Sequence, residues 1–276
     1  MTPLTFTLIV WGISYAAGLL GSLVGVGGGI IVVPALTLLL GVSIQKAIAA
    51  SIISVIATSS GAASSYVSER ITNMRLGMVL EVATVAGALT GAYLATVVSG
   101  RWLFVTFALV LGYTVWSMLR PRGSRIEAVP DPLADRLRLH GSYVDRSLGQ
   151  RVDYRVSRTK LGLAVSYVAG VASGLLGIGG GVLKVPVMNL AMGLPIKACT
   201  ATSNFMIGVT AATSAAVYFM RGEVLPFIAA PVAVGVLLGA RSGARLMGGL
   251  KSRYIRMIFV AVLAVSAAQM LLKGLR

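Results

Sequence analysis

The sequence predicts an all-α integral membrane protein made of two inverted structural repeats, with about five helical segments in each. Three observations lead to this fold class. The 276-residue chain is 57% hydrophobic and only 12% charged, which exceeds the apolar content of ordinary soluble domains. Apolar segments of membrane-spanning length recur along the chain. An unusual glycine-rich motif occurs once in each half.

Eight apolar segments are long enough to cross a bilayer, since a crossing helix requires about 20 residues. They cover residues 4–24, 47–67, 76–99, 103–119, 161–176, 198–220, 224–247 and 257–272. Eight is therefore a minimum. We expect the first segment to stay in the membrane and not to be removed as a secretory signal, because no Lys or Arg precedes Lys46 and another spanning pattern follows.

The glycine-rich motif reveals an internal repeat. Residues 25–36 read GVGGGIIVVPAL, and 152 positions later residues 177–188 read GIGGGVLKVPVM. The same offset, without a gap from about residue 11 to 119, pairs Ser14 with Ser166, Tyr15 with Tyr167, Ser51 with Ser203, Thr58 with Thr210, Tyr66 with Tyr218, Gly87 with Gly239 and Gly91 with Gly243. A register held over several segments indicates duplication. Repeat 1 then covers residues 1–119 and repeat 2 covers residues 161–276, and together they form one transport domain.

A polar connector, residues 120–160, separates the repeats. It contains ten Lys or Arg and five Asp or Glu. Because Lys and Arg concentrate in cytoplasmic loops of this length, we expect the connector in the cytoplasm. Its stretch YVDRSLGQRVDYRV predicts either a small β-hairpin or a solvated irregular loop. The net charge of +16 then reflects membrane topology, and nucleic-acid binding has no other support.

Equivalent loops of the two repeats differ in charge. The turn at 68–75 holds two arginines, whereas its counterpart offsets Arg221 with Glu223. Conversely, the turn near Arg101 is poor in charge, whereas basic residues fill its counterpart at 251–256. Inverted repeats produce this pattern, because the same loop faces opposite sides of the membrane in the two copies. We therefore expect inverted halves with both termini outside.

Inversion requires an odd number of crossings per repeat, so a fifth segment is needed. The remaining candidate is the apolar run after each motif, residues 30–40 and 182–192. At 1.5 Å per residue such a run covers roughly 17 Å, about half of the hydrocarbon core. It is predicted to be a short crossing or a re-entrant half-helix.

Four glycines within five residues disfavour a helix by about 1 kcal/mol each relative to alanine, so we expect the helix to break at each motif. A break at membrane depth is either buried in protein or lines a watery cavity. The restarted helix would present N–H groups and the positive end of its dipole to a small anion. The candidate substrate-binding glycines are Gly27, Gly28, Gly29, Gly179, Gly180 and Gly181. Close helix packing is the alternative role of membrane glycines, and it suits GALTG at 87–91 and GARSG at 239–243.

One intramembrane charge of each sign stands out. Lys184 lies about one turn into the second restarted helix, where the first repeat has Val32. Since a cation beside the positive end of a helix dipole is unfavourable alone, we interpret Lys184 as an unpaired counter-charge for a bound anion; the alternative is a side chain that snorkels to an interface. Glu81 is interpreted either as the carrier of a coupling proton or as an interfacial residue near Arg75.

Hydroxyl and amide side chains follow the motifs. Ser51, Thr202, Ser203 and Asn204 are candidate donors to complete the anion site. Hydrogen bonding between membrane helices is the alternative role. The single cysteine, Cys199, is expected to be a small buried hydrophobe. The only histidine, His140, lies in the connector, and no metal, redox or other cofactor is predicted.

The motif GxGGGxxxxP in both halves, with ATSNFMIGVTAATSA after the second copy, resembles the TauE/SafE family of membrane permeases, the sulfite and organosulfonate exporters. The resemblance covers both hydrophobic halves. It implies export of a small anion such as sulfite, sulfoacetate or a related sulfonate, coupled to the proton gradient. It also implies that Pro34, Pro186 and the stretch from Thr202 to Asn204 belong to the pocket. The first copy reads SIISV where the second reads SNFMI, so Ser51 matches the pattern less closely than Ser203.

The expected location is the cell (inner) membrane, with several membrane crossings. An intramembrane enzyme is disfavoured, because such chemistry needs a base or a metal and no spanning segment contains His. An anion channel or uniporter, or a transporter of another small oxyanion, is the alternative function. The expected partners are a small anionic substrate and the lipid bilayer, without nucleic acid, and a homodimer is compatible with the sequence.

Overall fold

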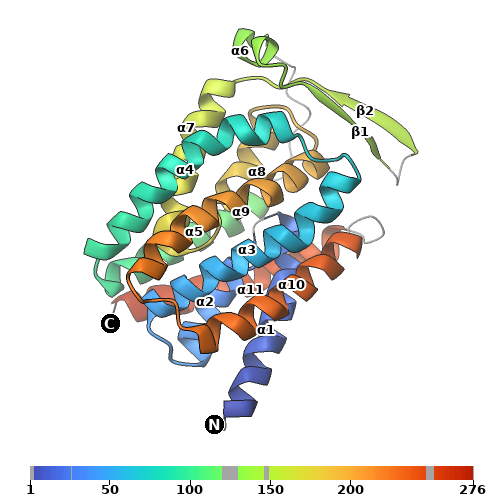
Figure 1. Ribbon diagram of the computed structural model, residues 1–276. Helices are drawn as coiled ribbons and strands as arrows, with labels where there is room; N and C mark the ends of the chain where they lie inside the picture. The colour runs from blue at the N-terminus through green and yellow to red at the C-terminus, as the bar shows by residue number, and fades with distance from the viewer. Residues whose placement is uncertain (1–2, 26, 120–129, 146–148, 247–251, 276) are drawn as a thin grey trace.

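The computed structural model of the chain describes residues 3–25, 27–119, 130–145, 149–246 and 252–275. The molecule is a bundle of helices that carries a small hairpin of strands at one end (Figure 1). The first half contains α1 (Pro3–Val24), α2 (Gly29–Pro34), the π-helical turn η1 (Ala35–Leu39), α3 (Ile44–Ser68), α4 (Met74–Val97) and α5 (Gly100–Leu119). The connector contains α6 (Pro132–Arg136), β1 (Gly141–Asp145) and β2 (Gln150–Tyr154). The second half contains α7 (Thr159–Leu176), α8 (Gly181–Leu190), α9 (Ile196–Met220), α10 (Pro226–Leu246) and α11 (Ser252–Leu275).

The prediction of an all-α membrane fold is confirmed. Each of the eight apolar segments forms a helix, and these helices are 18 to 25 residues long. Within the described residues, α1, α3, α4, α7 and α10 are long and apolar enough to cross a membrane. The run after each glycine motif is short and apolar, as expected for the fifth segment of each half.

The two halves are interlocked. In the first half, α1 packs along α10 and α4 packs along α7, both of the second half. These two pairs are equivalent, because the repeat offset places α1 on α7 and α4 on α10. Tyr15 Oη donates to Ser242 Oγ at 3.2 Å across the first pair, and the equivalent atoms Tyr167 Oη and Thr90 Oγ1 lie 3.3 Å apart across the second. The contacts therefore repeat when the halves are exchanged.

Glycines make both of these helix pairs possible. A Cβ at Gly87 would overlap the carbonyl oxygen of Tyr167, and a Cβ at the equivalent Gly239 would overlap the carbonyl oxygen of Tyr15. Backbones approach this closely only where the side chain is absent. The interpretation of the GALTG and GARSG stretches as packing motifs is confirmed by these contacts.

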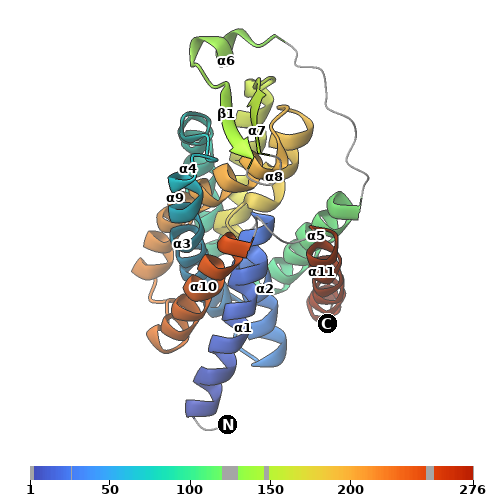
Figure 2. The ribbon, with the colours of Figure 1, turned by 90° about the vertical axis from the view of Figure 1, so that its right-hand side faces the viewer.

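The equivalent helices α3 and α9 pack against each other and run in opposite directions (Figure 1). Asn73, just beyond the end of α3, donates its backbone N–H to Thr202 Oγ1 near the start of α9 at 3.0 Å. At the other end of the bundle Phe6 of α1 stacks on Phe227 of α10. Figure 2 shows α5 and α11 side by side at one edge, with the hairpin at one end of the molecule and the start of α1 at the other.

The connector covers the ends of α8 and α9. The predicted β-hairpin is confirmed, since β1 and β2 pair antiparallel with Gly141 opposite Tyr154. Lys197 at the start of α9 forms a 2.7 Å ion pair with Asp145 of β1, and the backbone N–H of Ser157 donates to Met192 O. Leu139 and Val156 of the connector pack in one cluster with Met188 and Met192. The connector is thus fixed to α8 and to the start of α9. Residues 120–129 and the hairpin turn at 146–148 lie outside the described residues.

Asp131 joins the connector to α7. Its carboxylate accepts the N–H of Thr159 at 2.6 Å and also caps α6 through the N–H groups of Leu133 and Ala134. Burial raises the pKa of this carboxyl, but the N–H donors stabilise its charged form more strongly, so the pKa lies below its ordinary value. The first turn of α7 is therefore tied to an ionised side chain.

Substituting Gly239 by Ala is expected to destabilise the protein by about 1–3 kcal/mol, because the added methyl group meets a backbone carbonyl that cannot move aside. The measurement is the melting temperature of the purified protein in detergent. Gly112→Ala in α5 is the matched control: open space surrounds it, so its melting temperature should stay the same or rise. Equal melting temperatures for the two variants would show that α1 and α10 are not closely packed.

Candidate functional site

Both glycine motifs break the helix, as predicted. After α1 ends at Val24, Gly25 and Gly27 adopt φ values of +78° and +86°, and α2 begins at Gly29. After α7 ends at Leu176, Gly177, Gly179 and Gly180 all have positive φ, and α8 begins at Gly181. These conformations are readily available only to glycine. The glycines thus allow the chain to reverse direction inside the bundle. Val26 of the first motif lies outside the described residues.

The two breaks meet at the centre of the protein, where serines of the opposite repeat fix them. Ser51 of α3 donates to Gly177 O at 2.7 Å, and the equivalent Ser203 of α9 donates to Gly25 O at 2.8 Å. A Cβ at Gly29 would overlap Gly177 O, so the two motifs are in direct contact. Each repeat therefore satisfies a carbonyl oxygen that the break in the other repeat removes from its helix.

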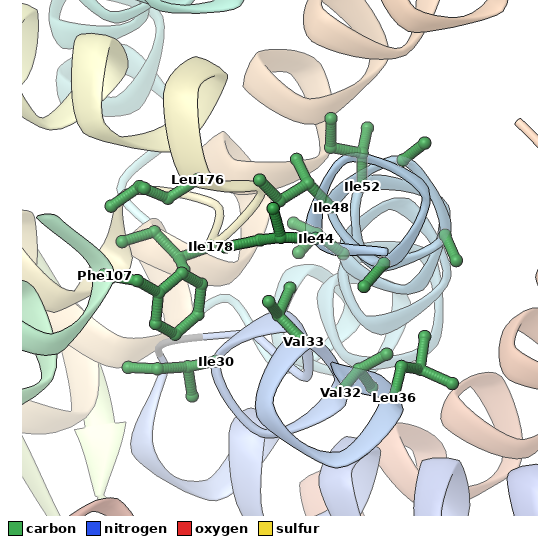
Figure 3. Packing of buried hydrophobic residues seen from close by; sticks show 14 of the residues in the cluster. Ile30, Val32, Val33, Leu36, Ile44, Ile48, Ile52, Phe107, Leu176 and Ile178 are labelled. Carbon is green, nitrogen blue, oxygen red and sulfur yellow. The ribbon is translucent and has the colours of Figure 1, made fainter. Parts of the chain in front are cut away.

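The space around the breaks is filled by apolar side chains. Figure 3 shows Ile30 and Val33 of α2 in one apolar cluster with Ile178 of the second motif and Ile48 of α3. These four residues are fully buried. Of the two environments expected for the broken backbone, burial in protein is therefore the one present in this conformation.

The predicted donors beside Ser203 are also engaged. Thr202 Oγ1 accepts the N–H of Asn73, and Asn204 Nδ2 donates to Thr200 O at 3.0 Å and to Ser22 O at 3.3 Å. These bonds fit the alternative role of holding helices together. Asn204 Oδ1 is different: it is buried and has no hydrogen-bond partner among the described residues.

Lys184 and Glu81 form a buried ion pair that the sequence analysis did not predict. Lys184 Nζ on α8 lies 3.6 Å from Glu81 Oε2 on α4. Thr210 of α9 joins the pair, because its hydroxyl donates to Glu81 Oε1 at 2.5 Å and accepts from Lys184 Nζ at 3.4 Å. Lys184 is 1% exposed and Glu81 is 6% exposed. The snorkelling alternative for Lys184 is therefore wrong, and so is its interpretation as unpaired.

This ion pair joins the two repeats, since Glu81 belongs to the first and Lys184 to the second, and it has no counterpart at the equivalent pair of positions. The equivalent positions are occupied by Val32, the mate of Lys184, and by Ala233, the mate of Glu81. Thr58, the mate of Thr210, instead accepts the backbone N–H of Gly28 at 3.1 Å. A sequence signal for the pair was present, since Glu81 is the one acid inside the eight apolar segments, Lys184 is the one charge in the apolar run after its motif, and neither has a charged mate.

The lysine of the ion pair lies in the first turn of α8. The first backbone bonds of this helix run from the N–H groups of Leu183 and Lys184 to Gly180 O. The N–H groups of Gly181 and Val182 precede those bonds and carry the positive end of the helix dipole. Lys184, the partner of Glu81, therefore lies in the first turn of α8, near the positive end of the dipole, and this arrangement favours negative charge beside it.

Within the described residues, no group of three His, Cys, Asp or Glu side chains is placed to hold a metal ion. Cys199 is buried, as expected for a small hydrophobe. The chain is thus a multi-pass helical bundle whose central helices are broken and whose interior holds a charged pair. These features are typical of a membrane transporter.

The chain belongs to the sulfite exporter TauE/SafE family, whose model matches residues 10–270. It is similar to the probable membrane transporter protein YunE of Bacillus subtilis, with 28% identity over 97% of each chain. A shorter match, 31% identical over 37% of this chain and 17% of the relative, is to the probable membrane transporter protein MamO of Paramagnetospirillum magneticum. Sulfite exporter TauE/SafE family protein 5 of Arabidopsis thaliana is 41% identical over 21% of this chain and 13% of its own. No solved structure matches the chain significantly.

Membership of this family identifies the protein as a membrane transporter of the TauE/SafE type and not an enzyme. With its apolar helices, it is a multi-pass protein of the cell membrane. Both statements agree with the predictions made from the sequence.

Gly180→Ala is expected to lower the melting temperature more than Gly28→Ala, although the two positions are equivalent in the repeats. Gly180 has φ +71°, which an L-residue adopts only with strain of order 1–3 kcal/mol, and its Cβ would lie 2.8 Å from Ala169 O. Gly28 has φ −68°, which any residue adopts. Thermal unfolding of both variants in detergent tests this order. A Gly28→Ala variant that melts first would contradict the asymmetry of the two breaks.

Proposed function

We propose that the protein exports a small sulfur-containing anion, such as sulfite, sulfoacetate or a related organosulfonate, across the cytoplasmic membrane and that its transport is coupled to the proton gradient. The observation that carries the proposal is the buried lysine beside the start of α8, where a cation and helix N–H groups meet. The name of the family and the name of the plant relative both refer to sulfite export. A sulfonate or sulfite group offers three oxygens to such donors.

The proposed anion site lies between the two breaks. Gly179, Gly180, Gly181 and Lys184 contribute from the second repeat, and Gly27, Gly28 and Gly29 from the first. A Cβ at Gly29 would meet Gly177 O, and one at Gly27 would lie near Ile178 O. Ser51 and Ser203 hold the broken backbone in place on either side, with Thr202 and Asn204 in the adjacent turn of α9. Because these groups are buried in the present conformation, substrate entry requires the breaks to move apart.

We further propose that the two repeats are inverted across the membrane, with the connector in the cytoplasm. Support comes from the opposite directions of α3 and α9 and from contacts that repeat when the halves are exchanged. The basic residues Arg70, Arg75 and Lys197 share the connector end of the bundle. A lipid bilayer would then surround the helices, and movement of one repeat against the other would expose the site alternately to the two sides.

Purified protein in liposomes is expected to release trapped sulfite or sulfoacetate at a saturable rate. The double variant Glu81→Ala/Lys184→Val should lower this rate at least about tenfold, because it removes the cation and leaves no unpaired buried charge. The introduced residues are those that occur naturally at the equivalent positions, Ala233 and Val32, so the fold should tolerate them.

The control for this flux is Lys46→Met, which removes an exposed lysine at the start of α3 and should transport normally. Imposed gradients separate the mechanisms: flux that responds to voltage and ignores pH would indicate an anion uniporter. If no small oxyanion crosses the membrane, the proposed function is wrong.

Membrane topology is tested with single cysteines at Thr2 and Ser142 in a Cys199→Ser background, probed in intact cells with an impermeant thiol reagent. We expect the cysteine at Thr2 to react from outside and the cysteine at Ser142, in β1, to react only after the cells are opened. Reaction of both from the same side would support parallel repeats instead of inverted ones.

A further inference from the structure

The ion pair of Lys184 and Glu81 raises a difficulty for the proposed anion site. While both groups are charged they neutralise each other, and Glu81 Oε2 lies only 3.6 Å from the lysine nitrogen. A second anion near Lys184 would meet the carboxylate at close range in an interior where charges are poorly screened. In the conformation described, the lysine is therefore not available as a counter-charge.

We propose that a proton and the transported anion bind together at this site, the proton on Glu81 and the anion on Lys184, in a ratio of one to one. The inference rests on the proposed function and specifies its coupling. Protonation turns the carboxylate into a neutral acid and leaves Lys184 as an uncompensated cation beside the start of α8. The anion then replaces the carboxylate as the partner of the lysine.

The geometry around Glu81 suits a carboxyl group that gains and loses a proton. Oε1 accepts from the hydroxyl of Thr210, a bond that a neutral carboxyl group retains. Oε2 is buried and has no hydrogen-bond partner among the described residues, so a proton added there breaks no hydrogen bond described in the structure. Its interaction with Lys184 at 3.6 Å is the one that protonation weakens.

Among the described residues, Lys184 is the charged group that the structure pairs with Glu81. On α7, which packs along α4, Lys160 lies in the first turn and the hydroxyl of Tyr167 lies beside Thr90. On α9, Lys197 is paired with Asp145 of the connector. A pH dependence of anion binding is therefore assigned to Glu81.

The one-to-one ratio follows from the difference between the repeats. Val32 and Ala233 occupy the positions equivalent to Lys184 and Glu81, so the first motif has neither the cation nor the proton acceptor. By linkage, protonation of Glu81 strengthens anion binding by the same factor as anion binding strengthens protonation. The proton and the anion therefore travel in the same direction, so during export of a doubly charged anion the membrane potential drives the cycle and a pH gradient that is acidic outside opposes it.

This direction of coupling has an energetic consequence. A singly charged anion would cross with its proton without net charge, and the membrane potential would not drive it. An anion with two negative charges would carry one net negative charge, which an interior-negative potential drives outward. Doubly charged sulfite and sulfoacetate are thus the forms whose export this site would favour.

The experiment measures proton uptake during anion binding by the full-length protein in detergent and weak buffer. Sulfoacetate is the probe, since its strongly acidic groups keep their charge between about pH 6 and pH 8. We expect about one proton to be taken up per anion bound, and an affinity that falls up to about tenfold per pH unit where Glu81 is ionised. Glu81→Gln imitates the protonated form, so it should bind sulfoacetate without proton uptake and equally well at each pH.

Glu69→Gln is the matched control, an exposed glutamate at the end of α3 that should behave as the wild type does. If the wild-type protein binds sulfoacetate without proton uptake, the inference and the proposed proton coupling are overturned, while the proposed anion export stands; this result depends on no variant. A stable Glu81→Gln protein that keeps the wild-type pH dependence would overturn the inference equally. If the wild-type protein neither binds nor transports sulfite or sulfoacetate, the proposed function fails and the inference fails with it.

Discussion

The structure depends on one constraint: a helix that breaks inside a membrane must find partners for its backbone within the protein. The protein meets it by exchange, because Ser51 of the first repeat binds Gly177 O and Ser203 of the second binds Gly25 O. The glycines have the positive φ values that bring these carbonyl groups within reach. Holding two breaks against each other brings the motifs into contact. It also explains why α3 packs against α9 and why helices pair between the repeats.

The ion pair modifies this symmetric arrangement and is not needed to build it. At the first break, Val32 and Ala233 occupy the equivalent positions, and the same kind of break forms. Replacing a buried ion pair by apolar residues is often neutral or stabilising by about 1–4 kcal/mol. Stability alone therefore gives no reason to retain Lys184 and Glu81 at the second break. Reversible binding of a proton and an anion does give a reason, because Lys184 has a negatively charged partner in both states. That partner is the Glu81 carboxylate in one state and the bound anion in the other.

Periodicity and repetition made most of the fold predictable. Apolar length gave the eight long helices, the glycine content of residues 25–29 and 177–181 gave the breaks, and alternation in the connector gave the hairpin. The site was less predictable because it depends on distances between segments that are far apart in the sequence. The sequence marks Lys184 and Glu81 as charges within apolar segments. Their pairing depends on how α8 lies relative to α4, and no local sequence pattern encodes that arrangement. The apolar side chains around the breaks were likewise not predictable, because their positions depend on the conformation.

Exchange of helices between repeats also affects how the chain assembles. The glycine-lined partner of α1 is α10, whose residues begin at Pro226. At a synthesis rate of roughly 5–20 residues per second, α1 leaves the ribosome roughly 10–40 s before α10 does. During that interval the close-packed face of α1 has only lipid or a chaperone as a neighbour. The first half of this protein therefore cannot mature as an independent unit, and its native packing begins only when the second half arrives.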